Sequence, residues 1–340
     1  MNCFDSYCRQ IIRPPRRQYM ISDLGNMHLQ IQKGPKIRFL QTKAIVRMDF
    51  VFESRNIQLN ASYFLTRSKN HRCMIYLHGN ASCRLEGIRY AEVLASWDIN
   101  LCVLDFAACG MSKGEFITMG VYESQDVIEL MKYIENNFGK VDEFMLWGRS
   151  MGAVTALLLT ENSKIRTYII DSAFSEFRQL LQDIGNRQFG VFSFVLYLAI
   201  PILRRKILNQ AQFDINLLNP IDKLKQVIPN KKFFFVAGKS DTLISYQYTL
   251  KLYENCQMPK KLDICEGDHN SNRPSTTLQR IIEFINEACE FKYNQEYQIR
   301  TEPYFKFQNQ HSSEEEEDSK LQIVLSEIKT PQTKQQFISN

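Results

Sequence analysis

Residues 144–152 have the sequence Phe-Met-Leu-Trp-Gly-Arg-Ser-Met-Gly, an apolar strand-like run that leads directly into a G-x-S-x-G motif. A helix rich in alanine and leucine is predicted immediately afterwards, over 151–161. This strand–turn–helix order is the setting of a nucleophile elbow, in which a sharp turn pushes a serine hydroxyl into a cleft. We therefore predict that Ser150 is a nucleophile, the alternative being an ordinary helix N-cap.

A second G-x-S-x-G sequence occupies residues 110–114, with Ser112 at its centre. It lies several residues beyond its strand and is not followed at once by a helical pattern. We interpret it as a glycine-rich loop near the site, because the motif predicts an elbow only in the strand–turn–helix setting.

From about residue 58, short apolar runs alternate with longer amphipathic stretches, a pattern typical of a mostly parallel α/β sheet flanked by helices. Apolar runs before this point are interpreted as the antiparallel start of the sheet. Sheets of this type carry their chemistry on loops at the carboxyl ends of the strands. Strands are predicted over 74–77, 101–104, 144–147, 168–170, 233–236 and 261–264, and helices over 84–97, 121–137, 151–161 and 276–290.

More than 60 residues separate the strands at 168–170 and 233–236, far more than an ordinary connection needs. This insert, about 174–228, contains an almost continuous apolar run over 189–203, closed by Arg204-Arg205-Lys206. Fifteen residues are short for a membrane span, which needs about 20. We expect a helical cap over the active site; a lid that lines an apolar pocket and a helix lying in a membrane interface are the alternatives.

A serine nucleophile needs a base, and the base needs an acid that orients it. Among five histidines only His269 follows the last predicted strand. Asp241 follows the strand before it and is the predicted acid. Asp171, at the end of strand 168–170, is the main rival, and Asp268 is a weaker one.

The sequence His78-Gly79-Asn80-Ala81 follows the first central strand. A backbone N–H from this loop can combine with that of Met151 to form an oxyanion hole. Asn80 is the predicted donor, with Ala81 next. His78 is interpreted as a structural histidine that holds the loop.

The composition is that of a globular chain: 340 residues, 44% hydrophobic, 23% charged, with a net charge of +5. A wholly disordered, collagen-like or coiled-coil chain is excluded, and the charge is too small to predict nucleic-acid binding. Nine cysteines without CxxC spacing or a histidine cluster predict neither a disulfide scaffold nor a zinc site. We expect no metal and no cofactor.

Three regions are expected along the chain: a basic segment over 1–57 leading into the first strands, the α/β domain over 58–292, and a disordered, acidic and Gln-rich tail over 293–340. Residues 1–47 hold nine basic residues against two acidic ones. They fit a solvated surface, an acidic partner or an anionic membrane. No secretory signal opens the chain. A cytoplasmic location is expected, with peripheral membrane attachment through acylated Cys3 and Cys8 as the alternative.

At these motifs the chain resembles the α/β-hydrolase superfamily, in particular its serine-aminopeptidase-like branch, which includes monoacylglycerol lipases and cytoplasmic protein depalmitoylases. The resemblance covers about 58–290 and rests on residues 76–82, 148–152 and 267–270, together with the chain order Ser, Asp, His. Residues 105–114 correspond to the branch's Asp-Tyr-Arg-Gly-Tyr-Gly-x-Ser-x-Gly loop, but Ala107 and Cys109 replace the usual Arg and Tyr.

The resemblance implies an α/β-hydrolase fold and a serine hydrolase that cleaves a carboxylic ester or thioester through an acyl-enzyme. Ser150, His269 and Asp241 would form the triad, and Asn80 and Met151 the oxyanion hole. The apolar insert favours an apolar acyl group over a charged peptide, and the expected substrate is a small molecule, a lipid or an acylated protein. Two alternatives stay open: an aminopeptidase-like amide hydrolase, for which Asp183 and Asp214 would have to bind the substrate amine, and a catalytically silent scaffold.

Overall fold

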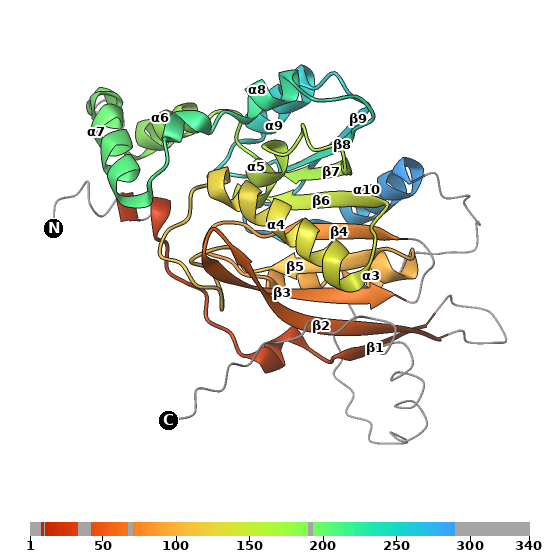
Figure 1. Cartoon of the computed structure of the whole chain (residues 1–340). Coiled ribbons are helices and arrows are strands. Elements are labelled where there is room, and N and C mark those ends of the chain that lie inside the picture. Colours follow the sequence, from red (N-terminus) through yellow and green to blue (C-terminus); the bar gives the residue numbers. More distant parts are fainter. Residues whose placement is uncertain (1–7, 10, 33–41, 67–70, 190–192, 290–340) are drawn as a thin grey trace, which may run out of the picture.

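The computed structural model describes residues 8–9, 11–32, 42–66, 71–189 and 193–289. Its strands form one nine-stranded sheet in the order β1-β2-β3-β5-β4-β6-β7-β8-β9 (Figure 1). The strands are β1 (His28–Gln32), β2 (Thr42–Ser54), β3 (Ile57–Thr66), β4 (Arg72–Leu77), β5 (Asn100–Leu104), β6 (Glu143–Arg149), β7 (Ile165–Asp171), β8 (Lys232–Gly238) and β9 (Lys260–Cys265).

The six strands from β5 to β9 in this order run parallel, which confirms the predicted mostly parallel sheet. Their sequences are almost continuously apolar because both faces of a parallel sheet are covered by helices. The antiparallel strands β1, β2 and β3 extend the sheet beyond β5. The sheet begins at His28, so β1 and β2 lie ahead of residue 58, where apolar runs were interpreted as the antiparallel start of the sheet.

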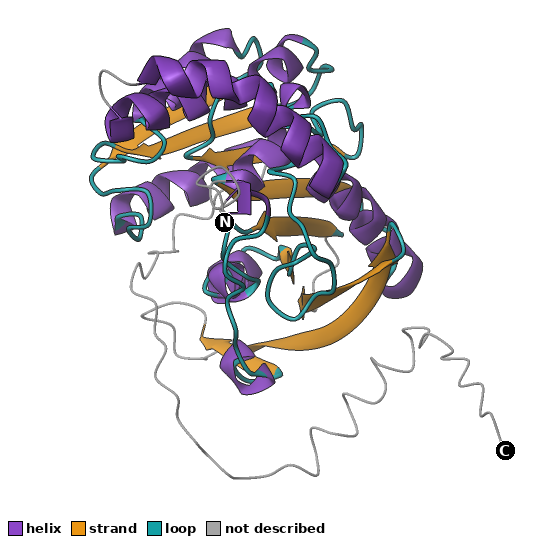
Figure 2. Cartoon of the chain, turned by 90° about the vertical axis from the view of Figure 1, so that its left-hand side faces the viewer, coloured by secondary structure: helices purple, strands orange, loops and turns teal. Residues whose placement is uncertain are grey.

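Helices cover the sheet on both sides (Figure 2). One apolar core lies beneath α4 (Val121–Phe138), α5 (Met151–Leu157) and α9 (Tyr246–Asn255), and the other beneath α3 (Ala91–Ser96) and α10 (Ser275–Ala288). The predicted helix over 84–97 is wrong in one respect: it is two short helices, α2 (Leu85–Ile88) and α3. Tyr90, between them, stacks on Trp147 of β6 with ring centroids 4.2 Å apart, so sheet packing places this break.

The insert is helical, as predicted. It consists of α6 (Phe177–Phe189), α7 (Ser193–Ala211), η3 (Ile215–Leu217) and α8 (Pro220–Lys225), and α6 and α7 stand at one end of the sheet in Figure 1. Arg204 of α7 forms an ion pair with Asp214, and Lys251 of α9 pairs with Glu176 at 2.7 Å. None of the described helices has the length and apolarity to cross a bilayer.

The N-terminal basic segment packs against the loop that follows β5. Arg16 donates to the carbonyl oxygens of Ala108, Ser112 and Gly114 at 3.2, 2.9 and 3.0 Å. Cys8 is fully buried in the core. Acylation of Cys8 would therefore require this segment to leave the core, whereas Cys3 and the predicted tail over 293–340 lie outside the described residues.

The helix α5 crosses β4 at backbone contact distance, and only glycine fits there. A Cβ atom at Gly152 would lie 2.0 Å from the carbonyl oxygen of Leu77, and one at Gly148 would lie 2.2 Å from that of Gly152. Both obstacles are backbone atoms, which cannot move without displacing a strand or helix. The elbow glycines therefore fix the distance between α5 and the sheet.

We expect Gly152→Ala to destabilise the fold by more than the roughly 2–5 kcal/mol of a large core truncation, because its methyl group would overlap Leu77 O. Thermal unfolding should show a large fall in Tm or loss of folded protein. Thr155→Ala in the same helix is the control, since it removes the hydrogen bond from Thr155 Oγ1 to Met151 O and one methyl group but introduces no overlap. Equal Tm values for the two variants would contradict this account of the elbow.

Candidate active site

Ser150, His269 and Asp241 come together at the carboxyl ends of β6, β9 and β8. His269 Nε2 lies 3.0 Å from Ser150 Oγ, and His269 Nδ1 lies 2.7 Å from Asp241 Oδ2. Each of the three residues is only 6% exposed. Ser150 has φ 54° and ψ −117° at the start of α5, a strained conformation for a residue with a side chain.

The environment of Asp241 fixes the orientation of the histidine. Its Oδ1 accepts hydrogen bonds from the backbone N–H groups of Leu243 and Ile244 at 2.9 and 2.8 Å, which leaves Oδ2 for the imidazole. An ionised carboxylate only accepts hydrogen bonds, so His269 Nδ1 carries the proton that it donates. In the neutral imidazole Nε2 is then an acceptor facing the Ser150 hydroxyl.

The two rival acids have other partners. Asp171 accepts hydrogen bonds from Arg273 Nη2 at 2.7 Å and from Arg273 Nε at 3.0 Å in a buried ion pair. Asp268 accepts from the backbone of Asn270 and Ser271 within its own turn. Neither carboxylate hydrogen-bonds the imidazole of His269, and Asp241 does.

The serine of the G-x-S-x-G sequence over 110–114 has a structural role. Ser112 is fully buried; its hydroxyl donates to the carbonyl of Asp105 at 2.6 Å and accepts from the backbone N–H of Asn60 at 2.8 Å. This hydroxyl joins the loop after β5 to strand β3, so the strand–turn–helix setting does distinguish the two copies of the motif.

The two predicted oxyanion donors come from a loop and from the start of a helix. Asn80 follows β4, and Met151 is the first residue of α5. Between β4 and Asn80, His78 is fully buried, with Nδ1 2.7 Å from Gly79 O and Nε2 3.1 Å from Phe106 N. Phe106 N–H must donate to Nε2, so Nδ1 carries the proton, and burial lowers the pKa of His78. A neutral His78 thus holds the loop, as expected from its position in the sequence.

Two proteins of similar sequence are themselves uncharacterized. YqkD of Bacillus subtilis (strain 168) is 26% identical over 227 residues, which covers 64% of this chain and 73% of YqkD. Protein R595 of Acanthamoeba polyphaga mimivirus is 24% identical over 246 residues, covering 66% of this chain and 76% of R595. No protein-family profile matches the chain.

Solved structures with a similar fold include esterase Pf2001 of Pyrococcus furiosus, with TM-score 0.58, 19% identity, and coverage of 81% of this chain and 99% of the esterase. Acetyl xylan esterase 1 of Thermoanaerobacterium sp. JW/SL YS485 has a TM-score of 0.53 and 15% identity, with coverage of 83% of this chain and 93% of the esterase. Acylaminoacyl peptidase of Pyrococcus horikoshii has a TM-score of 0.55 and 14% identity, with coverage of 75% of this chain and 43% of the peptidase. This chain has the α/β-hydrolase fold. Its narrower placement in the serine-aminopeptidase-like branch stays a prediction.

A buried ion pair adjoins the elbow that carries Ser150. Arg149, the residue before Ser150, donates through Nε and Nη2 to the two carboxylate oxygens of Glu86 at 2.5 and 3.0 Å. Glu86 also accepts from the hydroxyls of Tyr76 and Ser82 at 2.7 and 2.6 Å. Burial alone would raise the pKa of Glu86, but Arg149 and these hydroxyls outweigh it and lower the pKa to about 2.

This ion pair was not predicted from the sequence. Glu86 lies in the stretch 84–97, whose sequence indicates only helical spacing. Arg149 occupies a variable position of the G-x-S-x-G motif. The partners are 63 residues apart along the chain. Arg149 ends β6, and Glu86 lies on α2, which follows the neighbouring strand β4. No local sequence pattern indicates that contact.

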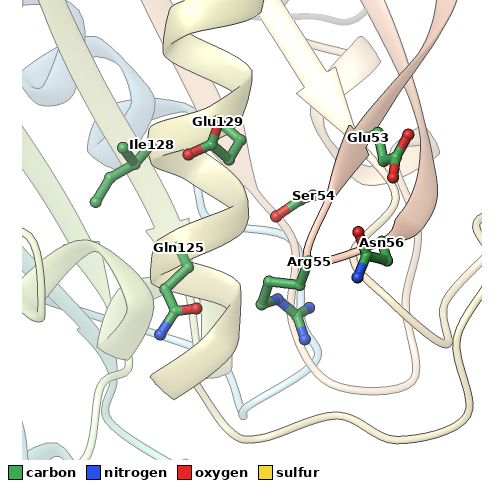
Figure 3. Close-up of a pocket in the computed structure, with 7 residues that line it drawn as sticks. All are labelled: Glu53, Ser54, Arg55, Asn56, Gln125, Ile128 and Glu129. Atoms are coloured by element: carbon green, nitrogen blue, oxygen red, sulfur yellow. The ribbon is translucent and has the colours of Figure 1, made fainter.

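A surface pocket lies away from the triad. It has a volume of about 440 Å³ between the β2–β3 turn and α4 (Figure 3). Its lining residues are Glu53, Ser54, Arg55, Asn56, Gln125, Ile128 and Glu129. In the described part of the chain, no three His, Cys, Asp or Glu residues are grouped so that they could hold a metal ion.

The lowered pKa of Glu86 predicts a contribution to stability that depends on pH. The pKa falls from 4.5 to about 2 on folding, so the contribution is complete above pH 4.5 and is lost as the pH falls toward 2. We expect the free energy of unfolding of wild type to exceed that of Glu86→Gln most above pH 4.5, and the gap to close toward pH 2. Urea unfolding across this range measures it, with Glu254→Gln at an exposed position of α9 as control. A constant gap would contradict the prediction.

Proposed function

We propose that the protein is a serine hydrolase that cleaves a carboxylic ester or thioester of an acyl substrate. The observation that carries the proposal is the hydrogen-bonded series Ser150–His269–Asp241 on a strained strand-to-helix turn. A buried serine facing an unprotonated imidazole nitrogen is activated for attack on a carbonyl carbon. The esterases and the peptidase that share the fold support a hydrolase in general terms.

In the proposed reaction, Ser150 Oγ attacks the substrate carbonyl carbon as its proton passes to His269 Nε2. The N–H groups of Asn80 and Met151 stabilise the oxyanion that develops on the carbonyl oxygen. His269 then returns the proton to the departing alcohol or thiol, leaving an acyl-enzyme on Ser150. Water, deprotonated by His269, releases the carboxylic acid and restores the serine hydroxyl.

We expect a fluorophosphonate probe to label wild type and Ser112→Ala but not Ser150→Ala. Among the serines that the structure describes, only Ser150 has an imidazole nitrogen beside its hydroxyl, at 3.0 Å, and the probe reacts with serines activated in this way. Gel fluorescence measures the labelling, and circular dichroism confirms folding. Well-folded wild type without labelling would contradict the proposal and favour the catalytically silent scaffold.

The carboxylates of the cap support an ester or thioester over an N-terminal peptide. An aminopeptidase-like enzyme needs a free carboxylate to bind the substrate amine. Asp183 accepts from Gln179 at 2.9 Å and from Tyr248, and Asp214 pairs with Arg204. Glu176 and Asp222 pair with lysines at 2.7 and 2.8 Å.

The surface of α7 supports an acyl substrate presented at a membrane. Ile202 and Leu208 are 53% and 40% exposed, and Arg205, midway between them, is also exposed. Apolar and cationic side chains at helical spacing on an exposed face favour binding to an anionic lipid surface. The cap would thus bring the site to lipid or to an acylated protein.

Replacing both Ile202 and Leu208 by Ser should weaken binding to vesicles that contain anionic lipid and slow hydrolysis of long-chain acyl substrates in them. Turnover of a short soluble ester should stay unchanged, because these side chains lie outside the triad. Vesicle sedimentation and both assays measure the effect. Val51→Ser, on β2 and 50% exposed, is the control. Unaltered sedimentation, or faster turnover of short esters than of every long-chain substrate by wild type, would contradict the membrane proposal.

A further inference from the structure

We propose that Arg149 and Glu86 are positioning residues: their buried ion pair aligns the oxyanion-hole loop with the elbow that carries Ser150. The inference rests on the proposed serine-hydrolase function and extends it to two residues outside the triad. Neither residue is assigned a contact with substrate. Their effect is transmitted through the backbone that carries Asn80.

Glu86 holds the oxyanion loop from one side. Its carboxylate accepts from Ser82 Oγ at 2.6 Å, at the far end of the loop, and lies 3.5 Å from Gly79 N, at the near end. It also accepts from Tyr76 of β4 at 2.7 Å. The carboxylate therefore ties both ends of the segment that carries Asn80 to the sheet.

Arg149 joins this carboxylate to the elbow. Its guanidinium lies so close to the loop that a Cβ atom at Gly79 would be 2.7 Å from Arg149 Nη2. Because Arg149 directly precedes Ser150, the ion pair fixes the loop relative to the nucleophile. Its side chain is 18% exposed and that of Glu86 4%, and such a pair is strongest in a water-poor environment.

The histidine loop depends less on Arg149. Arg149 Nη1 lies 3.4 Å from His269 O and 3.5 Å from Asn270 Oδ1, much longer than its contacts with Glu86. Arg273 independently donates to Asp268 O at 3.0 Å in the same loop. The main consequence of losing the pair should therefore fall on the oxyanion donor, while Ser150 and His269 remain in contact.

Arg149→Ala should lower kcat for an ester by about 10- to 100-fold, because displacing an oxyanion donor by even ~1 Å weakens transition-state stabilisation. KM should stay within about threefold. Millimolar guanidinium chloride should restore part of kcat by filling the vacated space beside Glu86, whereas sodium chloride should not. The double variant Arg149→Ala/Glu86→Gln should be no slower than the slower single variant, since both changes remove the same alignment.

Arg55→Ala is the matched control. Arg55 Nε and Nη2 donate to Asp126 Oδ1 and Oδ2 at 3.0 and 2.9 Å, and the Asp126 side chain is fully buried. Arg55 lines the pocket in Figure 3. This variant should lower Tm, as any broken buried pair does, and keep kcat. Arg149→Lys retains the charge without the two-pronged donor and should fall between wild type and Arg149→Ala in kcat.

The inference is overturned if Arg149→Ala keeps the kcat of Arg55→Ala, or if guanidinium restores no activity. Should Arg149→Ala fail to fold, wild-type kcat in folded Arg149→Lys overturns it equally. Failure of the underlying function is a separate result: wild type would then neither react with fluorophosphonate nor hydrolyse the ester. Active wild type with unchanged Arg149 variants refutes the positioning role alone.

Discussion

The close contact between α5 and β4 is the constraint on which the site depends. With glycine at 148 and 152, the helix backbone lies against the Leu77 carbonyl, where a Cβ at Gly152 would be 2.0 Å from oxygen. That contact holds Ser150 at φ 54°, a conformation that costs about 1–3 kcal/mol in an unconstrained chain. The hydrogen bond from Ser150 N to Asp171 O, 2.8 Å long, adds a second restraint from the neighbouring strand. The position of the serine hydroxyl is thus set by the packing of α5 on the sheet and by the neighbouring strand. The elbow sequence alone does not determine it.

Buried ion pairs hold the loops around the active site, which close backbone packing does not fix. Arg149 and Glu86 join the elbow to the oxyanion loop, and Arg273 joins Asp171 to the histidine loop. Burying such pairs adds little net stability compared with apolar packing, because desolvation offsets the attraction. Their directional hydrogen bonds do exclude alternative loop arrangements. We infer that these pairs contribute geometry in this fold more than free energy.

The fold and the meeting of three distant residues were predictable because each follows from strand order. A parallel sheet brings the carboxyl ends of its strands to one edge, so Ser150, Asp241 and His269 converge although 119 residues separate the first from the last. The break in the predicted helix over 84–97 was not predictable, because Tyr90 at the break stacks on Trp147 of β6, a contact between residues distant in the sequence. The ion pair between Arg149 and Glu86 was not predictable either, because it also joins residues on elements that are distant in the sequence. Periodicity records which face of an element is buried, and it does not record which polar side chains meet across two elements.

The basic N-terminus illustrates how charge in a sequence can serve the fold. Residues 105–114 lack the usual Arg and Tyr of the resembling branch, and Ala108 has φ 62° where that pattern has glycine. Arg16 supplies a guanidinium from outside the loop and donates to three of its carbonyls. Arg13 pairs with Glu115 at 2.9 Å, and Arg47 pairs with Asp49 at 3.1 Å. Part of the positive charge is therefore committed to internal contacts, and the loop it stabilises contains Phe106, the donor to His78. Through that histidine the N-terminal segment is connected to the oxyanion loop, so it belongs structurally with the α/β domain.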